Sequence, residues 1–248
     1  GDTVIVTGYD LGMNTAGGLG EYIRVPAAWA IKCPPGLDPR ASMLFGTAGL
    51  TAQLCINKLL RMGLEKDQGQ VLVTGATGGV GSIAVALLAN AGFDVVASSG
   101  KPDQADMLKR SGASEVIDRA ELSEPNKRPM LKERFAGAVD VVGGDTLANT
   151  IKSIKAGGSV ACCGLVQSPG FEGTVLPFIL RGVNLLGVDS VEIPLAEKQA
   201  AWEQLAKCAD LDSIASINRE ITLDEVPDTL VTVYGGGMAG HAIVNIGG

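Results

Sequence analysis

The feature that most constrains the fold of this chain is a regular alternation of two kinds of segment between residues 70 and 191. Six segments are short, apolar and rich in β-branched residues, as in VLVTG, DVVASSG and NLLGVDSV. Segments with apolar residues at helical spacing, such as SIAVALLANAG, DQADMLKRSG and TLANTIKSIKAGG, lie between them. Continuously apolar strands separated by helices indicate a parallel sheet that is covered on both faces. We therefore predict an α/β fold built on a doubly wound, six-stranded parallel Rossmann sheet.

A glycine-rich turn follows the first predicted strand, in VLVTGATGGVGS. Glycine permits positive φ angles and lets backbone N–H groups approach a pyrophosphate, and the helix that follows points its positive end at the phosphates. The turn lies between a strand and a helix, which is the context that a dinucleotide site requires. We predict coenzyme contacts at Thr77, Gly78, Gly79 and Val80.

The glycines of this turn fit two known spacings. Thr74, Gly75, Gly79 and Gly81 match the TGxxxGxG pattern of short-chain dehydrogenases, which need a tyrosine followed four residues later by a lysine. At that spacing the three tyrosines of the chain are followed by Met13, Pro26 and Met238. The short-chain interpretation therefore fails, and the other spacing, GxxGxxG over residues 75–81, remains.

The end of the second predicted strand indicates which nicotinamide coenzyme binds. In NAD-binding Rossmann folds an acidic residue stands there and contacts the ribose 2′-hydroxyl. This chain has Ser98, Ser99, Gly100 and Lys101 instead. Hydroxyls and a cation without a neighbouring carboxylate can hold a 2′-phosphate. We predict NADP(H), with contacts at Ser99, Gly100 and Lys101; an ordinary polar loop is the alternative.

The two ends of the chain differ from this central pattern. Residues 1–36 are glycine-rich and β-like, with predicted strands in TVIVTG, GLGEYIRVP and AWAIKCPPG. The last part contains a predicted helix around Trp202, a second over residues 224–233 and a final strand in HAIVNI. We divide the chain into a partial β-rich domain (1–43), an NADP-binding domain (44–190) and a return to the β-rich domain (191–248). Because the chain begins inside a predicted strand, we expect an N-terminal portion to be missing.

Composition excludes several classes of partner. A net charge of −7 without a run of Lys and Arg argues against nucleic acid and against an anionic membrane surface. The most apolar stretch, residues 41–60, is interrupted by Gln53, Asn57 and Lys58, so we predict no membrane span. Five irregularly spaced cysteines suit a reducing cytoplasm. His241 is the single histidine, so we predict no metal site.

Several motifs together resemble those of medium-chain dehydrogenases and reductases. GGLGEYIRVP resembles the end of their GroES-like substrate domain, and GTAGLTA resembles the helix before their coenzyme fold. The lack of zinc ligands points to the zinc-free quinone oxidoreductase and enoyl reductase branch. With TGYDLGMN, SEVIDRAEL, FAGAVDVVGG, PFILRG and GVDSV, the chain resembles the acrylyl-CoA reductase group, some of whose members are named quinone oxidoreductases. The resemblance runs from Gly1 nearly to the end.

This resemblance implies further coenzyme contacts. Arg119 matches a family position at the adenosine end of NADP, and Leu165, Ile179 and Ser190 match positions that line the coenzyme. Taken locally, Arg119 also fits a solvated surface, and Leu165 and Ile179 also fit the core. His241 stands where the family usually has arginine; it is either structural or a coenzyme contact, and a phosphate contact would make binding pH-sensitive.

The resemblance also implies the reaction. Hydride passes from C4 of NADPH to the β-carbon of an α,β-unsaturated thioester such as acryloyl-CoA, and negative charge moves to the thioester oxygen. Such a site needs hydrogen-bond donors and a proton for the α-carbon. Asn14 is the best polar candidate for the pocket rim, against a role in a turn. An NADPH-dependent quinone reductase and a non-catalytic NADP-binding module remain as alternatives.

The sixth predicted strand, NLLGVDSV, bears on assembly. In a doubly wound sheet it lies at an edge, and its side chains Leu185, Leu186, Val188 and Val191 are apolar, with Asp189 as its one charge. Exposed edges are usually blunted by charge or proline. We predict a homodimer that pairs this edge with the same strand of a second subunit. The alternative is an edge covered by the chain's own C-terminal segment.

Overall fold

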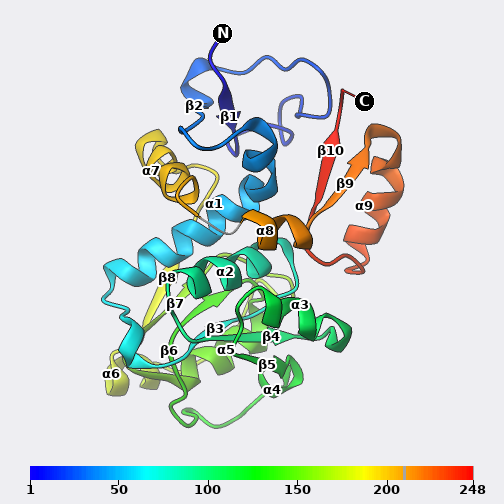
Figure 1. The fold of residues 1–248 in the computed structure, drawn as a ribbon. Helices are drawn as coiled ribbons and strands as arrows, with labels where there is room; N and C mark the ends of the chain where they lie inside the picture. Colours follow the sequence, from blue (N-terminus) through cyan, green and yellow to red (C-terminus); the bar gives the residue numbers. More distant parts are fainter. Residues whose placement is uncertain (209–210, 248) are drawn as a thin grey trace.

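A six-stranded parallel sheet lies at the centre of this computed structural model, which describes residues 1–208 and 211–247 (Figure 1). Its strands are β3 (Val71–Val73), β4 (Val95–Ser99), β5 (Glu115–Asp118), β6 (Phe135–Asp140), β7 (Ile154–Cys162) and β8 (Asn184–Gly187). They lie in the order β5-β4-β3-β6-β7-β8, and every neighbouring pair is parallel. The predicted doubly wound sheet is confirmed. Because the order reverses between β3 and β6, the ligand crevice of such a sheet opens at the carboxyl ends of these two strands.

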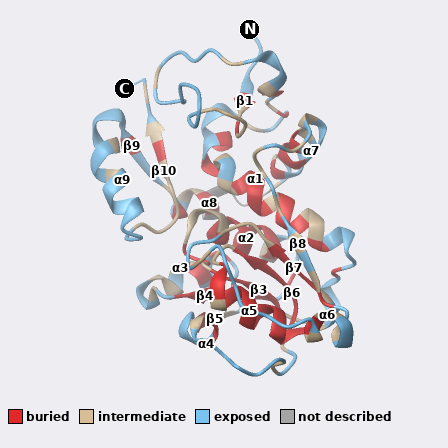
Figure 2. Cartoon of the chain, turned by 180° about the vertical axis from the view of Figure 1, so that it is seen from behind, coloured by how far each residue is buried: buried red, intermediate tan, exposed pale blue. Residues whose placement is uncertain are grey.

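Helices cover both faces of the sheet, since its strands are apolar on both sides. Helices α1 (Pro39–Arg61), α2 (Gly79–Asn90) and α3 (Ala105–Arg110) cover one face, and α4 (Ala120–Ser123), α5 (Gly144–Ser153) and α6 (Leu176–Arg181) cover the other. The side chains of β3 alternate between the two layers: Val71 and Val73 join the core on the α2 side, whereas Leu72 joins the core on the α5 side. Buried residues accordingly concentrate in the sheet and in the helices next to it (Figure 2).

Two small sheets lie apart from the central one, toward the chain ends in Figure 1. Strand β1 (Val4–Val6) pairs antiparallel with β2 (Ala30–Lys32), and β9 (Arg219–Thr222) pairs parallel with β10 (Ala242–Asn245). The other elements are α7 (Leu195–Leu205), α8 (Leu211–Ile217) and α9 (Val226–Tyr234), with short 3-10 helices η1 (Ala27–Trp29), η2 (Lys66–Gln68), η3 (Pro102–Gln104) and η4 (Leu223–Glu225). The structure thus contains the helix predicted around Trp202, the helix predicted over residues 224–233 and the final predicted strand. The division of the chain into three parts stays a prediction.

Helix α1 contains a break that links the two ends of the chain. The helix begins where the Asp38 carboxylate accepts a hydrogen bond from the Ala41 N–H at 2.6 Å. At Gly46 the backbone leaves the helical region, with φ 52° and ψ −156°. Just before this break, the carbonyls of Met43 and Leu44 face Nε2 of His241 at 3.2 Å and Nδ2 of Asn218 at 2.9 Å. The predicted boundary after residue 43 therefore falls inside α1, close to the break.

Three predicted segments differ from the structure. The predicted helix in TLANTIKSIKAGG ends earlier, at Ser153, because Ile154 adopts an extended conformation and pairs with β6. The sixth strand ends at Gly187 and not at Val191, whose carbonyl accepts hydrogen bonds from outside the sheet. No strand forms in GLGEYIRVP, since no described strand lies beside these residues to pair with them.

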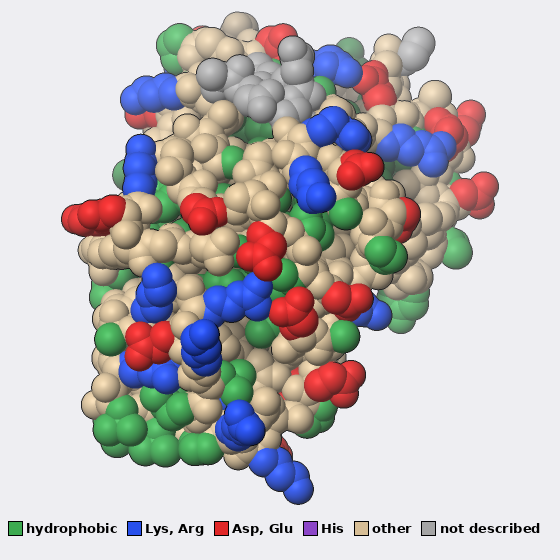
Figure 3. All heavy atoms as spheres, turned by 60° about the horizontal axis from the view of Figure 1, so that its bottom comes forward, with side chains coloured by type: hydrophobic (Ala, Val, Ile, Leu, Met, Phe, Trp, Pro, Cys, Tyr) green, Lys and Arg blue, Asp and Glu red, His purple; other side chains and the backbone are tan. Residues whose placement is uncertain are grey.

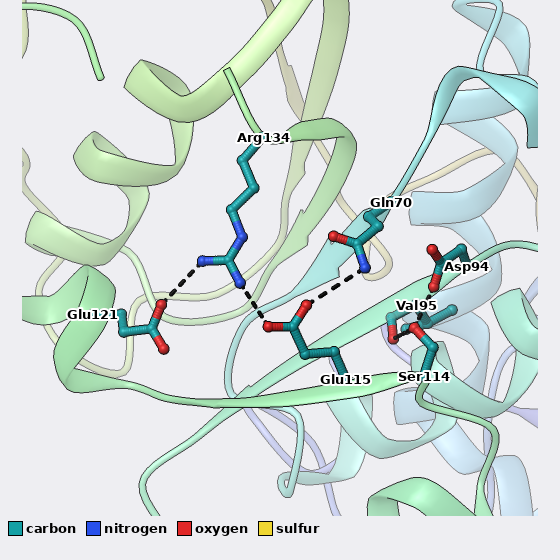
Figure 4. A network of polar contacts seen from close by, with 7 residues as sticks. All are labelled: Gln70, Asp94, Val95, Ser114, Glu115, Glu121 and Arg134. Carbon is teal, nitrogen blue, oxygen red and sulfur yellow. Dashed lines mark hydrogen bonds and ion pairs between the residues drawn. The ribbon is translucent and has the colours of Figure 1, made fainter. Parts of the chain in front are cut away.

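A polar network closes the amino edge of the sheet (Figure 4). Arg134, just before β6, bridges Glu115 at the start of β5 and Glu121 of α4, with N–O distances of 3.0 Å to each. Gln70, just before β3, donates to the other oxygen of Glu115 at 3.4 Å. The network ties together the starts of three strands at the edge opposite the crevice, so we assign it to the fold and not to the chemistry.

The surface mixes charges of both signs. On the face shown in Figure 3, acidic and basic side chains are interspersed. Across the described residues, no helix combines the length and the apolar character that a bilayer span needs.

Candidate functional site

The glycine-rich turn between β3 and α2 closes tightly on itself. Gly75 has a φ of +58°, and the N–H of Gly78 donates to the Gly75 carbonyl at 2.9 Å. A Cβ at Gly81 would stand 2.3 Å from the same carbonyl oxygen. No acidic side chain lies in the first turn of α2, and Gly78 at its N-cap supplies no side-chain cap. The first N–H groups of this twelve-residue helix therefore favour an anion at the end of β3.

A cavity of about 770 Å³ opens beside this turn, at the carboxyl ends of β3 and β4. Five of the predicted coenzyme residues line it: Thr77, Ser99, Gly100, Lys101 and Arg119. They come from three successive βα connections, which the parallel sheet brings to one edge. Gly78, Gly79 and Val80 form the adjoining start of α2. This edge of the sheet is therefore the candidate site.

Hydroxyl groups and cations meet at the end of β4. The Oγ atoms of Thr77 and Ser99 lie 3.3 Å apart, and the backbone N–H of Lys101 donates to Ser99 Oγ at 3.0 Å. The side chain of Arg119 lies over Gly100, where an added Cβ would stand 2.5 Å from Arg119 Cδ. This combination suits a phosphate monoester, which cations and hydroxyls bind by charge-assisted hydrogen bonds.

One acidic side chain, Glu124, also lines the cavity. It belongs to the connection after α4 and stands apart in sequence from the end of β4.

A buried carboxylate outside the set of predicted site residues shapes another wall of the cavity. Asp140 ends β6 and is fully buried. It accepts hydrogen bonds from Thr74 Oγ1 at 2.7 Å and from the Gly143 N–H at 2.9 Å. Burial raises the pKa of the Asp140 carboxyl, and these hydrogen bonds lower it in part. Asp140 thus holds the turn that carries Val142 to the cavity. The sequence signal for this role was an acidic residue at the end of an otherwise apolar strand.

Residues 235–241 run across the site as a strap. Gly235 and Gly236 line the cavity. The Gly240 N–H donates to the Thr77 carbonyl at 2.9 Å, and Lys101 Nζ donates to the Met238 carbonyl at 2.7 Å. The strap thus joins the C-terminal part of the chain to the phosphate turn, and it occupies one hydrogen bond of the predicted phosphate-binding lysine.

His241 ends the strap and lies against the start of α2, since its Cβ is 3.7 Å from a Cβ built at Gly79. Its Nε2 faces the Met43 carbonyl, which can only accept, so Nε2 carries a proton. Nδ1 is buried and has no hydrogen-bond partner among the described residues. Burial lowers the pKa of His241, against a smaller increase from the Met43 carbonyl. Burial thus favours the neutral ring, and the coenzyme contact stays a prediction.

The other predicted residues are not among those that line the cavity. Leu165 and Ile179 are 64% and 68% exposed, so neither is a core residue. Ser190 Oγ receives a hydrogen bond from Thr51 at 2.9 Å, beyond the end of β8. Asn14 donates from Nδ2 to the Asp10 carboxylate at 2.8 Å within an exposed turn, which is the alternative role considered for it. Their contacts with coenzyme or substrate stay predictions.

Residues 79–210 match the family model described as zinc-binding dehydrogenase. The residues present do not fit a zinc ion: among the described residues, no three His, Cys, Asp or Glu side chains lie together in an arrangement that could hold a metal. Cys33, Cys55, Cys162, Cys163 and Cys208 are all free thiols.

Relatives are similar over nearly the whole chain. YhfP of Bacillus subtilis, which is named as a quinone oxidoreductase, is 45% identical over 99% of this chain and 75% of its own length. The acrylyl-CoA reductase AcuI of Ruegeria pomeroyi is 43% identical over 99% of this chain and 74% of its own length.

Solved structures agree with this similarity. Escherichia coli K-12 YhdH, crystallised with NADPH, has a TM-score of 0.96 at 41% identity and covers 99% of this chain, which spans 76% of that structure. The crystal structure of Bacillus subtilis YhfP, with NAD bound, has a TM-score of 0.95 at 45% identity; the match covers 99% of this chain and 75% of that one.

Proposed function

Because this chain belongs to the medium-chain dehydrogenase/reductase superfamily, in its acrylyl-CoA reductase and quinone oxidoreductase group, we propose that it reduces the C=C bond of an α,β-unsaturated thioester such as acryloyl-CoA with NADPH. The protein is an oxidoreductase, so the alternative of a non-catalytic NADP-binding module is set aside. The observation that carries the proposal is the convergence of Thr77, Ser99, Lys101 and Arg119 on one cavity beside a phosphate-binding turn.

The shape and charge of the cavity fit NADPH. The turn after β3 and the start of α2 would hold the pyrophosphate, and Ser99, Lys101 and Arg119 would hold the 2′-phosphate. The tight approach of Gly81 to Gly75 supports this assignment, because a side chain there would push the turn apart. Structures of relatives with NADPH and with NADP are in agreement, and the YhfP structure with NAD makes the preference worth measuring.

When bound, the coenzyme supplies the hydride, and the protein's residues orient it and exclude water. The nicotinamide half of a dinucleotide lies over the second half of a doubly wound sheet, here the carboxyl ends of β6, β7 and β8. Ser190 follows β8 at this end of the sheet and would line that half. A thioester enolate can be stabilised by neutral hydrogen-bond donors, so the reaction needs no metal ion.

Quinone reduction is the second candidate. The name of YhfP favours it, and an open pocket that accepts hydride would serve either substrate. The two functions share fold and coenzyme and differ only in the acceptor.

Turnover with a panel of acceptors tests the proposal. NADPH oxidation would be followed by the loss of its absorbance, with acryloyl-CoA, longer enoyl-CoA esters, simple enones and benzoquinone as acceptors. We expect the highest kcat/KM with acryloyl-CoA. A kcat/KM that is higher for benzoquinone would favour the second candidate, and no turnover with any thioester would refute the first.

We also propose that the protein is a cytoplasmic homodimer that pairs through β8. This strand is at the sheet edge, and Ile179 and Leu180 of the neighbouring α6 are 68% and 67% exposed. Strands β9 and β10 pair with each other, so among the described strands none covers the free side of β8. The location is proposed from the free cysteines.

A further inference from the structure

Helix α7 packs against α1 and β2 (Figure 1), and a lysine of α7 is buried at this contact. Lys198 has no exposed surface. Its ammonium donates to the carbonyls of Thr7 and Val191, each at 2.8 Å, and lies 3.4 Å from the centroid of the Tyr9 ring. One charged group thus joins two segments that are far apart in the sequence.

Burying this charge is costly, because an ammonium leaves water without a carboxylate to balance it. Among the described residues, Lys198 forms no ion pair within 4 Å. Burial lowers the pKa of Lys198, while the carboxylates of Glu192 and Asp189 raise it, and the pKa lies below its usual value of 10.5. The groups in direct contact with the ammonium are the two carbonyl dipoles and the aromatic face, and both favour the charged form.

The first of the two segments is strained. Gly8 and Tyr9 both have positive φ angles, 75° and 53°, and Tyr9 is the one residue other than glycine with a positive φ among those described. The ring of Tyr9 stacks on Trp29 with centroids 5.5 Å apart, and its hydroxyl donates to the Ile193 carbonyl at 3.3 Å. Strain of this kind persists only where surrounding contacts hold it. Lys198 is one of those contacts, and the segment continues into the turn that carries Asn14.

The second segment continues from β8 at the carboxyl end of the sheet. Val188 N–H still donates to the Cys162 carbonyl at 2.9 Å, and Val191 then turns its carbonyl to Lys198 and to the N–H of Tyr9. Ser190 lies between Val188 and Val191 in the chain. In a doubly wound sheet this end of β7 and β8 is where the nicotinamide half of the coenzyme binds.

We propose that Lys198 is a positioning residue for hydride transfer, which joins the segment of Tyr9 and Asn14 to the segment of Ser190 and Val191 and so fixes two walls of the pocket where nicotinamide and acceptor meet. The inference rests on the proposed function of this site. It predicts an effect on kcat that leaves the binding of the phosphate end of NADPH unchanged, because Lys101 and Arg119 lie at the other end of the site.

The test compares Lys198→Met, which keeps an unbranched side chain one atom shorter and removes the charge, with Lys198→Arg as the matched control. For K198M we expect kcat to fall roughly 10- to 100-fold, because small misplacement of reacting groups has effects of this size. The dissociation constant of NADPH, from calorimetry, should stay within about twofold. K198R should retain most of the wild-type kcat, because a guanidinium also donates to two carbonyls.

The pH profile gives a second readout. The rate of the wild-type enzyme should fall as the pH rises through the lowered pKa of Lys198, below 10.5. The charged groups that act on this ammonium are Glu192 and Asp189, and the Tyr9 hydroxyl donates to the Ile193 carbonyl. K198R should lack this decrease, because its guanidinium keeps its proton.

Amide hydrogen exchange of the coenzyme-free protein separates this inference from the proposed function. K198M should exchange faster than wild type in residues 7–15 and 188–193 and equally elsewhere. Equal exchange in both segments, a wild-type kcat, or an equal loss of kcat and of NADPH affinity would overturn the inference. If wild type reduces no acceptor, the proposed function fails, and exchange alone decides the inference. If K198M does not fold, Tyr9→Leu takes its place and must show the same separation.

Discussion

Replacing Gly81 by alanine would test how tightly the turn after β3 is closed. A Cβ at this position would stand 2.3 Å from the Gly75 oxygen and 2.8 Å from Ala76 Cα, whereas ordinary contacts begin near 3.4 Å. The turn would have to open by roughly 1 Å, and no rotamer change can relieve a contact with backbone atoms. Overpacking of this kind costs about 1–3 kcal/mol. Alanine returns about 0.5–1 kcal/mol of helix propensity, so we expect the free energy of unfolding to fall by roughly 1–2 kcal/mol.

Thermal denaturation and calorimetry would measure this effect. A loss of that size lowers Tm by roughly 2–8 °C in a protein of this length. NADPH affinity should fall at least about tenfold, because the N–H groups that face the pyrophosphate move with the turn.

The matched control is Gly79→Ala, two residues earlier in the same helix. Its Cβ would meet its nearest neighbour, the Cβ of Ala48, at an ordinary 3.5 Å. We expect G79A to melt at or above the wild-type temperature. A G81A protein with wild-type Tm and wild-type NADPH affinity would refute the reasoning about this turn.

The remaining predictions concern coenzyme choice, pH, metal and assembly. Lys101→Met should lower the preference for NADPH over NADH at least tenfold (about 1.4 kcal/mol), because the 2′-phosphate loses a cation; calorimetry with both coenzymes checks this, and equal losses for the two would contradict it. His241 has a pKa below its usual 6.5, so the unfolded chain takes up the proton first. Stability should be complete above about pH 6.5 and fall as the pH decreases through the lowered pKa, and urea titrations should show that His241→Gln removes this dependence. Elemental analysis should find no stoichiometric zinc, and chelators should leave activity unchanged; one zinc per chain would contradict the absence of a fitting ligand set. Leu186→Lys should shift the protein toward monomer in light scattering, whereas a wild-type monomer at micromolar concentration would rule out the β8 dimer.

The central sheet could be predicted because burial on both faces leaves a clear pattern in the strands. The boundary between α5 and β7 could not. Ile151, Ile154 and the lysines around them fit a helical period as well as a strand, and only the pairing of Ile154 with Phe135 of β6 decides it. Strand pairing of this kind produces no recognisable pattern in the local sequence.

The candidate site likewise has features that could be predicted from the sequence and features that could not. Ser99 ends a predicted strand, and Thr77, Lys101 and Arg119 each follow one. A parallel sheet brings such positions together, so their convergence could be expected. The strap over residues 235–241 could not be predicted from the sequence, because no local pattern links Gly240 to Thr77. The roles of Leu165 and Ile179 came from resemblance alone, and both side chains lie exposed.

The break in α1 at Gly46 also limits how the length of this chain can change. Upstream of it, the carbonyls of Met43 and Leu44 face side chains from near the C-terminus. One residue inserted or deleted between Asp38 and the break would rotate these carbonyls by about 100° around the helix axis, away from both partners. Residues 127–130, in contrast, lie in a connection with no helix or strand, between the carbonyls of Asn126 and Leu131 that accept hydrogen bonds from Lys152 and Arg181. Added residues disturb little there. We therefore expect insertions and deletions among related chains to accumulate in that connection and to be absent from the first two turns of α1.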